Sequence, residues 1–289
     1  MIILAHAKVN LTLYITGRDK KDGYHYIESV FDPVSLCDVL EIKPLKSREI
    51  RLVQSGNSLD IAPEKNLVYR AAVMLQKASK TKKGAFIILH KRIPDGAGLG
   101  GGSSDAAAVL RGLNRLWGLK WDVNKLKKLA FKLGSDVPFF IESRPAIVSG
   151  KGEKIRPFRR PAEMWYVIAV KKGVKIPTPE AYNWYDKDLK LTSGQNRDII
   201  VSRLMRESIN SRLTGFLHND FEAPVFKRRK KLAKLKAYLQ KCGNTRNAQM
   251  SGSGSAVFAV FNNQDQALSC YKKAKKGLRG SFICLAHSI

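Results

Sequence analysis

A glycine-rich segment between an apolar stretch and an alanine-rich stretch constrains the fold of this chain most. Residues 96–102 contain five glycines in seven positions, and two serines, Asp105 and three alanines follow them. Glycine adopts positive φ and lets a ligand approach the backbone, and the first turn of a helix presents unpaired N–H groups and partial positive charge. We therefore predict a loop that opens a helix and binds an anion, preferably phosphate.

Two familiar phosphate-binding loops do not fit this segment. The chain has no G-x-x-x-x-G-K-[ST] pattern, which excludes a Walker loop. Gly96, Gly98 and Gly101 match G-x-G-x-x-G, but a dinucleotide site also needs an acidic residue at the end of the next strand, about 20 residues on. Asp122 lies near that distance, yet it begins a helical pattern. A glycine-rich linker also fits poorly, because apolar residues 86–89 precede the segment and a helix follows it.

Composition favours a globular protein of one large domain or two packed domains. The chain has 289 residues and 44% hydrophobic content. No apolar run approaches the ~18 residues of a membrane span, and the N-terminus has no secretory signal, so we expect a cytoplasmic protein without a membrane partner. The four cysteines are scattered, which predicts free thiols in a reducing compartment.

The chain is strongly basic, with a formal net charge of +28 and a pI near 10.1. Such a field attracts nucleic acid, acidic membrane surfaces or phosphorylated metabolites, and the charge alone does not decide among them. The basic runs at 227–231 and 272–276 are interleaved with apolar residues at helical spacing, which favours solvated helix faces.

Hydrophobic patterning predicts a mixed chain of strands and helices. Strands are expected over residues 2–16, 27–31, 39–42, 85–91, 164–170 and 256–261. Helices are expected from residue 67 with Asn66 as N-cap, over 104–117, over 122–133, after the Pro-Thr-Pro segment 177–179, and over 219–239. A second glycine-serine loop, residues 251–255, runs directly into a strand.

Two polar features stand out within apolar surroundings. Alternation along residues 5–11 puts Lys8 and Asn10 on one face of a strand, which indicates either a site or a wet face. Asp136 stands at a helix-to-strand corner before a proline and two phenylalanines, where it is either a structural cap or an acid held near a cation. Local reasoning favours the cap.

Three separated motifs can now be combined. In their order and spacing, residues 7–11, 94–108 and 251–255 resemble the three signature motifs of the GHMP kinase superfamily, over nearly the whole chain. Finer details resemble one branch of it, whose substrate is a cytidine diphosphate derivative of methylerythritol; they lie at residues 23–25, 66–68, 134–140, 176–179 and 219–222.

The resemblance implies an α/β (α+β) fold of two domains, with the active site in the cleft between them. The expected division is an ATP-binding domain over residues 1–160 and a substrate-side domain over 161–289. The implied reaction transfers the γ-phosphoryl group of ATP to the 2-hydroxyl of the substrate. Mg²⁺ is expected to accompany ATP, through phosphate oxygens and the Ser104 hydroxyl or a water, without an all-protein metal site.

The resemblance also implies roles for particular residues. Lys8 and Asp136 flank the reacting hydroxyl as catalytic residues, because the acid can accept its proton and the lysine can draw the transferring group. Tyr24 and Tyr182 sandwich the cytosine and His25 bonds its polar edge. The remaining substrate contacts are expected from Asn10, Thr178, Ser253 and Gly254. The ATP contacts are expected from Asn66, Leu67, Lys91, Pro94, Gly96, Ala97, Gly98, Leu99, Gly100, Gly101, Gly102, Ser103 and Ser104.

Two alternative functions remain at this point. Another kinase of the superfamily, acting on homoserine, mevalonate or a sugar, has no use for a pair of aromatic rings around a base. An RNA-binding protein would explain the charge, but most aromatic residues here lie in apolar runs. We therefore expect ATP and one small-molecule substrate as partners, no obligate nucleic acid, and a monomer or weak homodimer.

Overall fold

The structure, a computed structural model, describes residues 1–56, 62–160, 162–188 and 217–289. These residues form two compact units. The first unit comprises Met1–Ala7, Leu36–Asp95 and Gly100–Arg144, and the second comprises Lys8–Ser35, Gly96–Leu99 and Pro145–Ile289. Strands β1 (Ile2–Arg18) and β2 (His25–Leu45) each run through both units. The expected division at residue 160 stays a prediction.

In the first unit, the second half of β2 pairs with β4 (Gly84–Lys91), and β4 pairs with β3 (Ile50–Gly56). The β2–β4 pair is antiparallel, with Ile42 opposite Ile87, whereas β3 and β4 are parallel. A parallel pair needs a crossover, and the short 3₁₀ turn η1 (Pro63–Lys65) and helix α1 (Leu67–Ser79) lie in that connection. Asn66 caps α1 as expected, because its side chain accepts a hydrogen bond from the Val68 N–H.

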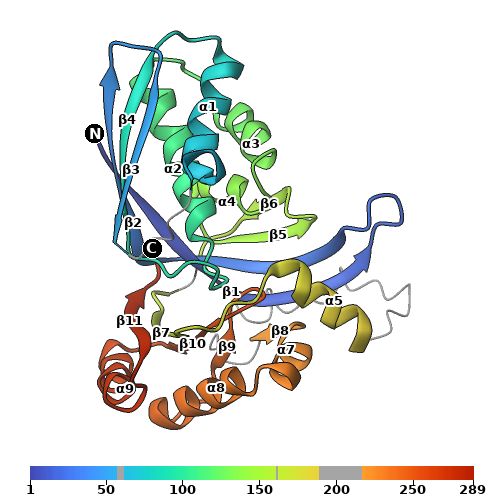
Figure 1. Ribbon diagram of the computed structural model, residues 1–289. Helices are drawn as coiled ribbons and strands as arrows, with labels where there is room; N and C mark the ends of the chain where they lie inside the picture. Colours follow the sequence, from blue (N-terminus) through green and yellow to red (C-terminus); the bar gives the residue numbers. More distant parts are fainter. Residues whose placement is uncertain (57–61, 161, 189–216) are drawn as a thin grey trace. The chain divides into compact units, whose positions relative to one another are not determined.

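In the first unit, helix α1 lies beside α2 (Gly101–Leu116), as Figure 1 shows. The alanines at 106–108 of α2 are fully buried, and their small side chains allow neighbouring elements to approach closely. Helix α3 (Val123–Phe131) begins after Asp122, whose side chain accepts from the Lys125 N–H, as the helical interpretation of this acid predicted. Helix α4 (Val137–Glu142) packs against α2 and α3.

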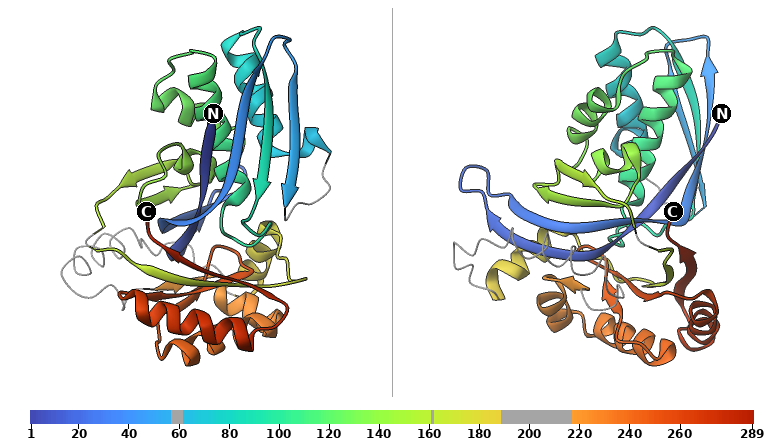
Figure 2. Two further views of the ribbon diagram at one scale, coloured as in Figure 1. Left: turned by 90° about the vertical axis from the view of Figure 1, so that its left-hand side faces the viewer. Right: turned by 180° about the vertical axis from the view of Figure 1, so that it is seen from behind.

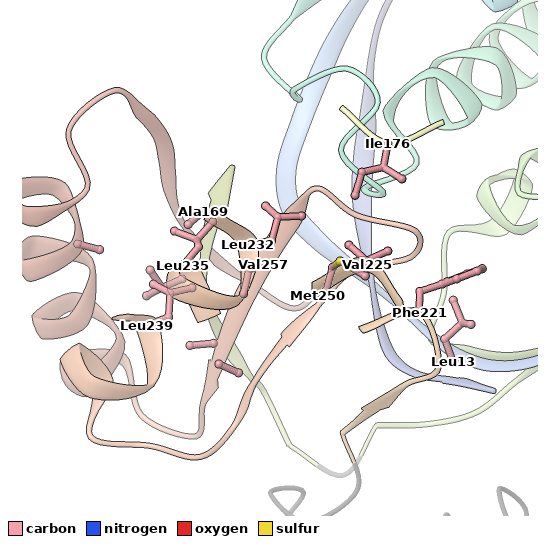
Figure 3. Close-up of a cluster of buried hydrophobic side chains, with 14 of the residues drawn as sticks. Leu13, Ala169, Ile176, Phe221, Val225, Leu232, Leu235, Leu239, Met250 and Val257 are labelled. Atoms are coloured by element: carbon pink, nitrogen blue, oxygen red, sulfur yellow. The ribbon is translucent and has the colours of Figure 1, made fainter. Parts of the chain in front are cut away.

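The second unit contains an antiparallel sheet in the order β11-β7-β10-β9. Its strands are β7 (Trp165–Lys171), β9 (Ala248–Met250), β10 (Ala256–Phe261) and β11 (Ser281–His287). Helices α8 (Lys230–Gly243) and α9 (Gln264–Gly277) pack on this sheet (Figure 1). Leu232, Leu235 and Leu239 line one face of α8 at helical spacing and enter the core shown in Figure 3.

The rest of the second unit is built on the β1–β2 hairpin, which is seen from two further sides in Figure 2. Strand β5 (Ala146–Gly150) pairs with β2 and with β6 (Lys154–Pro157), and β8 (His218–Asn219) is parallel to β1. Helices α5 (Thr178–Asp188) and α7 (Glu222–Arg228) contact each other.

Three expectations about element boundaries were wrong. The two strands expected at 27–31 and 39–42 are one continuous β2, because Pro33 removes a backbone donor without leaving extended geometry, and its carbonyl accepts from Ile289 N at 3.2 Å. The helix expected over 219–239 is divided at Arg229, whose φ of −123° and ψ of 64° are not helical, and Asn219 lies in β8. Helix α2 begins three residues earlier than expected, at Gly101.

Two compositional expectations can also be compared with the structure. All four cysteines are free thiols. Within the described ranges, every helix is too short or too polar to cross a lipid bilayer.

Candidate active site

The glycine-rich loop has the backbone conformation that its sequence predicts. Gly96, Gly98 and Gly100 have φ of +63°, +76° and +70°, a region that side chains with a Cβ rarely adopt. Residues 96–99 belong to the second unit, and residues 100–104 belong to the first. The segment thus supplies alternating left-handed residues directly before a helix.

The loop ends at the N-terminus of α2, where Gly100 is the N-cap residue and provides no side-chain hydrogen bond. The Ser104 N–H donates to the Gly100 carbonyl at 2.8 Å and closes the first helical turn. The backbone N–H groups of Gly101, Gly102 and Ser103 therefore come before the first intrahelical bond, where helices present donors to anions. This arrangement fits a phosphate group.

In the second unit, the first part of the loop is packed against the loop that precedes β10. Ser251 Oγ donates to the Gly98 carbonyl at 2.9 Å, and the Ala256 N–H donates to the Ala97 carbonyl at 2.9 Å. A Cβ on Gly98 would lie 2.1 Å from the Ser251 carbonyl oxygen, closer than atoms can pack. The two glycine-containing loops therefore hold each other, and Gly98 is required by this contact as well as by its φ.

Lys8 and Asn10 lie on one face of β1, as alternation predicted. Both are buried, at 3% and 1% exposure, and Lys8 Nζ donates to Asn10 Oδ1 at 2.6 Å. Lys8 Nζ also lies 4.3 Å from the centre of the Phe31 ring. The Lys8 backbone N–H donates to the Leu99 carbonyl at 2.9 Å, which ties β1 to the glycine-rich loop. Burial of both side chains excludes the interpretation of this strand face as a solvent-exposed one.

The residues expected around cytosine are only partly brought together. The rings of His25 and Tyr182 are stacked, 4.3 Å apart and 14° from parallel, and the edge of Phe221 meets Tyr182. His25 Nε2 lies 2.7 Å from Asp186 Oδ1. Tyr24 is 64% exposed at the turn between β1 and β2. One side of Tyr182 is thus occupied by His25, and the sandwich of cytosine between Tyr24 and Tyr182 stays a prediction.

The remaining substrate-side residues form a hydrogen-bonded group around the second loop. Thr178 Oγ1 lies 3.0 Å from Ser253 Oγ, which connects the start of α5 to this loop. Gly254 has a φ of +91°, and a Cβ there would meet the Met250 sulfur at 2.8 Å. Asn219 braces the loop by donating to the carbonyls of Met250 and Gly252 at 2.7 and 2.8 Å.

In the first unit, Lys91 belongs to a buried ion cluster with Asp38 and Asp105. Lys91 Nζ donates to Asp38 Oδ2 and, at 2.8 Å, to Asp105 Oδ2, and all three side chains are 3% exposed or less. Burial raises the pKa of Asp105 to about 8; Lys91 opposes this rise, and the Asp38 charge adds to it. Burial disfavours the Lys91 charge, but the two carboxylates outweigh it and raise the Lys91 pKa.

This cluster joins the end of β4 to the first turns of α2, so Lys91 stabilises the helix that follows the glycine-rich loop. The Asn66 side chain also makes structural hydrogen bonds: it caps α1, and its Nδ2 donates to Gln54 Oε1 at 2.7 Å. Leu67 begins α1, and Pro94 directly precedes the glycine-rich loop. Direct contacts of these residues with ATP stay predictions.

Asp136 immediately precedes helix α4 and is half-buried, so the helix-to-strand corner expected here was wrong. Its side chain makes no capping hydrogen bond to this helix, and a proline stands in the first turn. The structure therefore weighs against the cap that local reasoning favoured. Its catalytic role is a separate matter and stays a prediction.

Sequence reasoning missed several partners of the expected site residues. Ser29 bonds Asn10 and Asp186 bonds His25, but the second pair is separated by 161 positions in the chain. Nothing in a single sequence couples residues so far apart. Ser251 was within a recognised motif, so its involvement could have been anticipated.

Comparison with known proteins identifies the class. The chain matches the model for the GHMP kinases N terminal domain over residues 66–144 and the model for the GHMP kinases C terminal domain over residues 196–280. A solved homoserine kinase from Cytophaga hutchinsonii is 19% identical with a TM-score of 0.75, over 100% of this chain and 94% of its own, which shows a shared fold alone. These matches define a two-domain GHMP-type kinase.

More similar relatives identify the family within that class. The 4-diphosphocytidyl-2-C-methyl-D-erythritol kinase of Symbiobacterium thermophilum is 42% identical over 92% of each chain. A crystal structure of 4-(cytidine 5'-diphospho)-2C-methyl-D-erythritol kinase is 33% identical, with a TM-score of 0.79 over 99% of each chain. The protein belongs to the family of 4-diphosphocytidyl-2-C-methyl-D-erythritol kinases. It is thus an ATP-dependent small-molecule kinase, and this favours the main interpretation over the other substrates and over RNA binding.

Proposed function

We propose that the protein transfers the γ-phosphoryl group of ATP to the 2-hydroxyl of 4-diphosphocytidyl-2-C-methyl-D-erythritol. The observation that carries this proposal is the buried Lys8–Asn10 pair, whose strand is bonded through the Lys8 N–H to the glycine-rich loop. Phosphoryl transfer depends mainly on positioning and charge stabilisation, and this arrangement places an ammonium group on a strand that is attached to a phosphate-binding loop.

Each catalytic requirement has a candidate residue. Asp136 accepts the proton of the 2-hydroxyl as general base, and Lys8 stabilises the negative charge of the transferring group. The backbone N–H groups of residues 101–103 and the left-handed glycines before them bind the phosphates of ATP.

Mg²⁺ fits this scheme as a companion of ATP. Among the described residues, no cluster of three or more histidine, cysteine, aspartate or glutamate side chains could hold a metal ion. In this proposal the phosphate oxygens of ATP would be its main ligands, and the Ser104 hydroxyl in the first turn of α2 would offer a further oxygen donor of suitable chemistry. When bound, Mg²⁺ neutralises the charge that develops on the phosphates.

His25 supplies the basis for choosing cytosine over uracil. If His25 donates from Nε2–H to Asp186, its Nδ1 is left as an acceptor. Cytosine offers an exocyclic amine as donor at the position where uracil offers a carbonyl oxygen. Tyr24 and Tyr182 contribute ring faces for stacking, and Asn10, Thr178, Ser253 and Gly254 complete the substrate contacts.

A coupled assay of ATP consumption tests the function directly. The cytidine substrate should support turnover, whereas homoserine and mevalonate should not. Replacement of Tyr182 by alanine should raise the KM for the cytidine substrate about 10- to 100-fold, since stacking on one base is worth about 1–3 kcal/mol, and should leave the KM for ATP almost unchanged.

The matched control is Tyr182→Phe, which keeps the ring and should be nearly silent. Equal turnover of a substrate without cytidine would refute the proposed specificity. The cytoplasmic location and the monomeric or weakly dimeric state stay predictions.

A further inference from the structure

The network around Lys8 includes a serine that the proposed chemistry does not use. Ser29 lies on β2, is fully buried, and accepts a hydrogen bond from Asn10 Nδ2 at 2.9 Å. Its own hydroxyl donates to the Thr12 carbonyl on β1. Ser29 thus stands on the opposite side of the Asn10 amide from Lys8.

This arrangement fixes which way the Asn10 amide points. The two ends of an asparagine amide have nearly the same shape, so hydrogen-bond partners decide its orientation. A carbonyl oxygen only accepts, so the single Ser29 hydroxyl hydrogen is committed to Thr12. The Ser29 oxygen then faces Asn10 as an acceptor and requires the NH₂ group on that side.

The other end of the amide must therefore be the oxygen, and its contact with Lys8 agrees. Asn10 Oδ1 lies 2.6 Å from Lys8 Nζ, and an ammonium group can only donate. In the reversed orientation, two donors would oppose each other at Lys8 and two acceptors would oppose each other at Ser29. Buried groups opposed in this way are costly.

We propose that Ser29 is a positioning residue for the kinase reaction: it holds the Asn10 amide so that Oδ1 fixes the Lys8 ammonium group. This inference rests on the proposed function, in which Lys8 stabilises the transferring phosphoryl group. The competing explanation is structural, because the bond from Ser29 to Thr12 also joins β1 to β2 next to the Val30 N–H bond to Thr12 Oγ1.

A double-mutant cycle with Asn10→Asp separates the two explanations. A carboxylate accepts at both ends, so it needs no orientation by Ser29. We expect Ser29→Ala to lower kcat about 5- to 30-fold when residue 10 is asparagine, the size of one lost buried hydrogen bond, with both KM values changed less than about 2-fold. In the Asn10→Asp background, Ser29→Ala should change kcat less than about 2-fold.

Ser288→Ala provides the matched control. Ser288 is also a buried serine of the second unit, and its Oγ accepts from the Met164 N–H at 2.9 Å. This variant should lower the melting temperature without changing kcat. An equal loss of kcat from Ser29→Ala in both backgrounds would assign Ser29 a purely structural role, and an unchanged kcat in the Asn10 background would also overturn the proposal.

A readout without turnover keeps this test separate from the proposed function. The side-chain amide signal of Asn10 in an ¹⁵N-labelled sample can be assigned by its loss in Asn10→Asp. Its NH₂ protons should be protected from solvent exchange in the unmodified protein and lose that protection in Ser29→Ala. If the cytidine substrate gives no turnover, the proposed function fails, while unchanged protection would still refute the orientation by Ser29.

Discussion

Lys8 in the second unit and Lys91 in the first unit are both buried lysines on strands, but their partners differ in kind. Lys8 is 3% exposed, donates to an amide oxygen and lies over an aromatic ring. Lys91 is also buried and donates to the carboxyl groups of Asp38 and Asp105. An amide dipole and an aromatic face attract an ammonium group without forming an ion pair, whereas the Asp38 and Asp105 carboxyl groups form ion pairs with Lys91.

The difference shows that burial of a lysine does not by itself indicate catalysis. Both lysines were assigned to the kinase site from the sequence, yet the contacts of Lys91 are those of a structural ion cluster under α2. In the proposed mechanism it is the Lys8 charge that stabilises the transferring phosphoryl group. The same substitution at the two positions should therefore have opposite consequences for activity and stability.

The largest expected effect is on turnover. Lys8→Met keeps an unbranched side chain and removes the charge, so kcat should fall about 10²- to 10⁴-fold, as expected for loss of a group that acts in the transition state. The melting temperature should change little. Steady-state kinetics and calorimetry measure both quantities, and near-normal kcat would remove Lys8 from the mechanism.

The second effect is on stability. Lys91→Met leaves Asp38 and Asp105 buried without their cation, which should lower the free energy of unfolding by about 3–5 kcal/mol. Denaturant titration measures it. The control is Lys127→Met in the same unit, because the pair of Lys127 with Glu142 is partly exposed and should be worth about 1 kcal/mol or less.

A different result at Lys91 would reverse the comparison. If Lys91→Met unfolds at the same denaturant concentration as the unmodified protein but binds ATP weakly, Lys91 is a nucleotide ligand and not mainly a structural cation. The contrast between the two lysines would then disappear.

The sequence predicted the local parts of this structure well. The glycine-rich loop before α2, the cap of α1 by Asn66 and the shared face of Lys8 and Asn10 depend on neighbouring residues and strand alternation. These signals act over a few positions, where backbone geometry leaves few choices.

What the sequence could not predict depends on residues far apart in the chain. Asp38 and Lys91 are 53 positions apart, and His25 and Asp186 are 161 apart. The ion-pair partners of a buried cation are such distant residues, and the hydrophobic periodicity of the sequence does not indicate them. The sequence also gave no sign that the helix is divided at Arg229, because this residue and its direct neighbours include neither proline nor glycine.

The smallest expected effect concerns the pH dependence of the ion cluster. Asp105 has a pKa of about 8, against an ordinary value of 3.8, because it is buried; Lys91 only partly opposes this rise. Between these values the folded state holds a proton that the unfolded state releases, so this group's contribution to stability decreases as pH rises toward 8 and is lost above it. Titration of this one group changes the free energy of unfolding by at most about 1.4 kcal/mol per pH unit.

Asp105→Asn removes this proton and keeps an acceptor for Lys91. Asp105 Oδ1 has no hydrogen-bond partner in the described part of the chain, so an amide NH₂ at that position breaks no existing bond. Between pH 6 and pH 9 the stability of the variant should rise by about 2–3 kcal/mol relative to that of the unmodified protein, because only the unmodified protein holds a buried proton that its unfolded state releases. Urea titrations across this range measure the difference, and Asp122→Asn at the exposed cap of α3 is the control substitution. If the stability curves of Asp105→Asn and the unmodified protein stay parallel, Asp105 does not titrate in this range, and the raised pKa assigned to its buried carboxyl group is wrong.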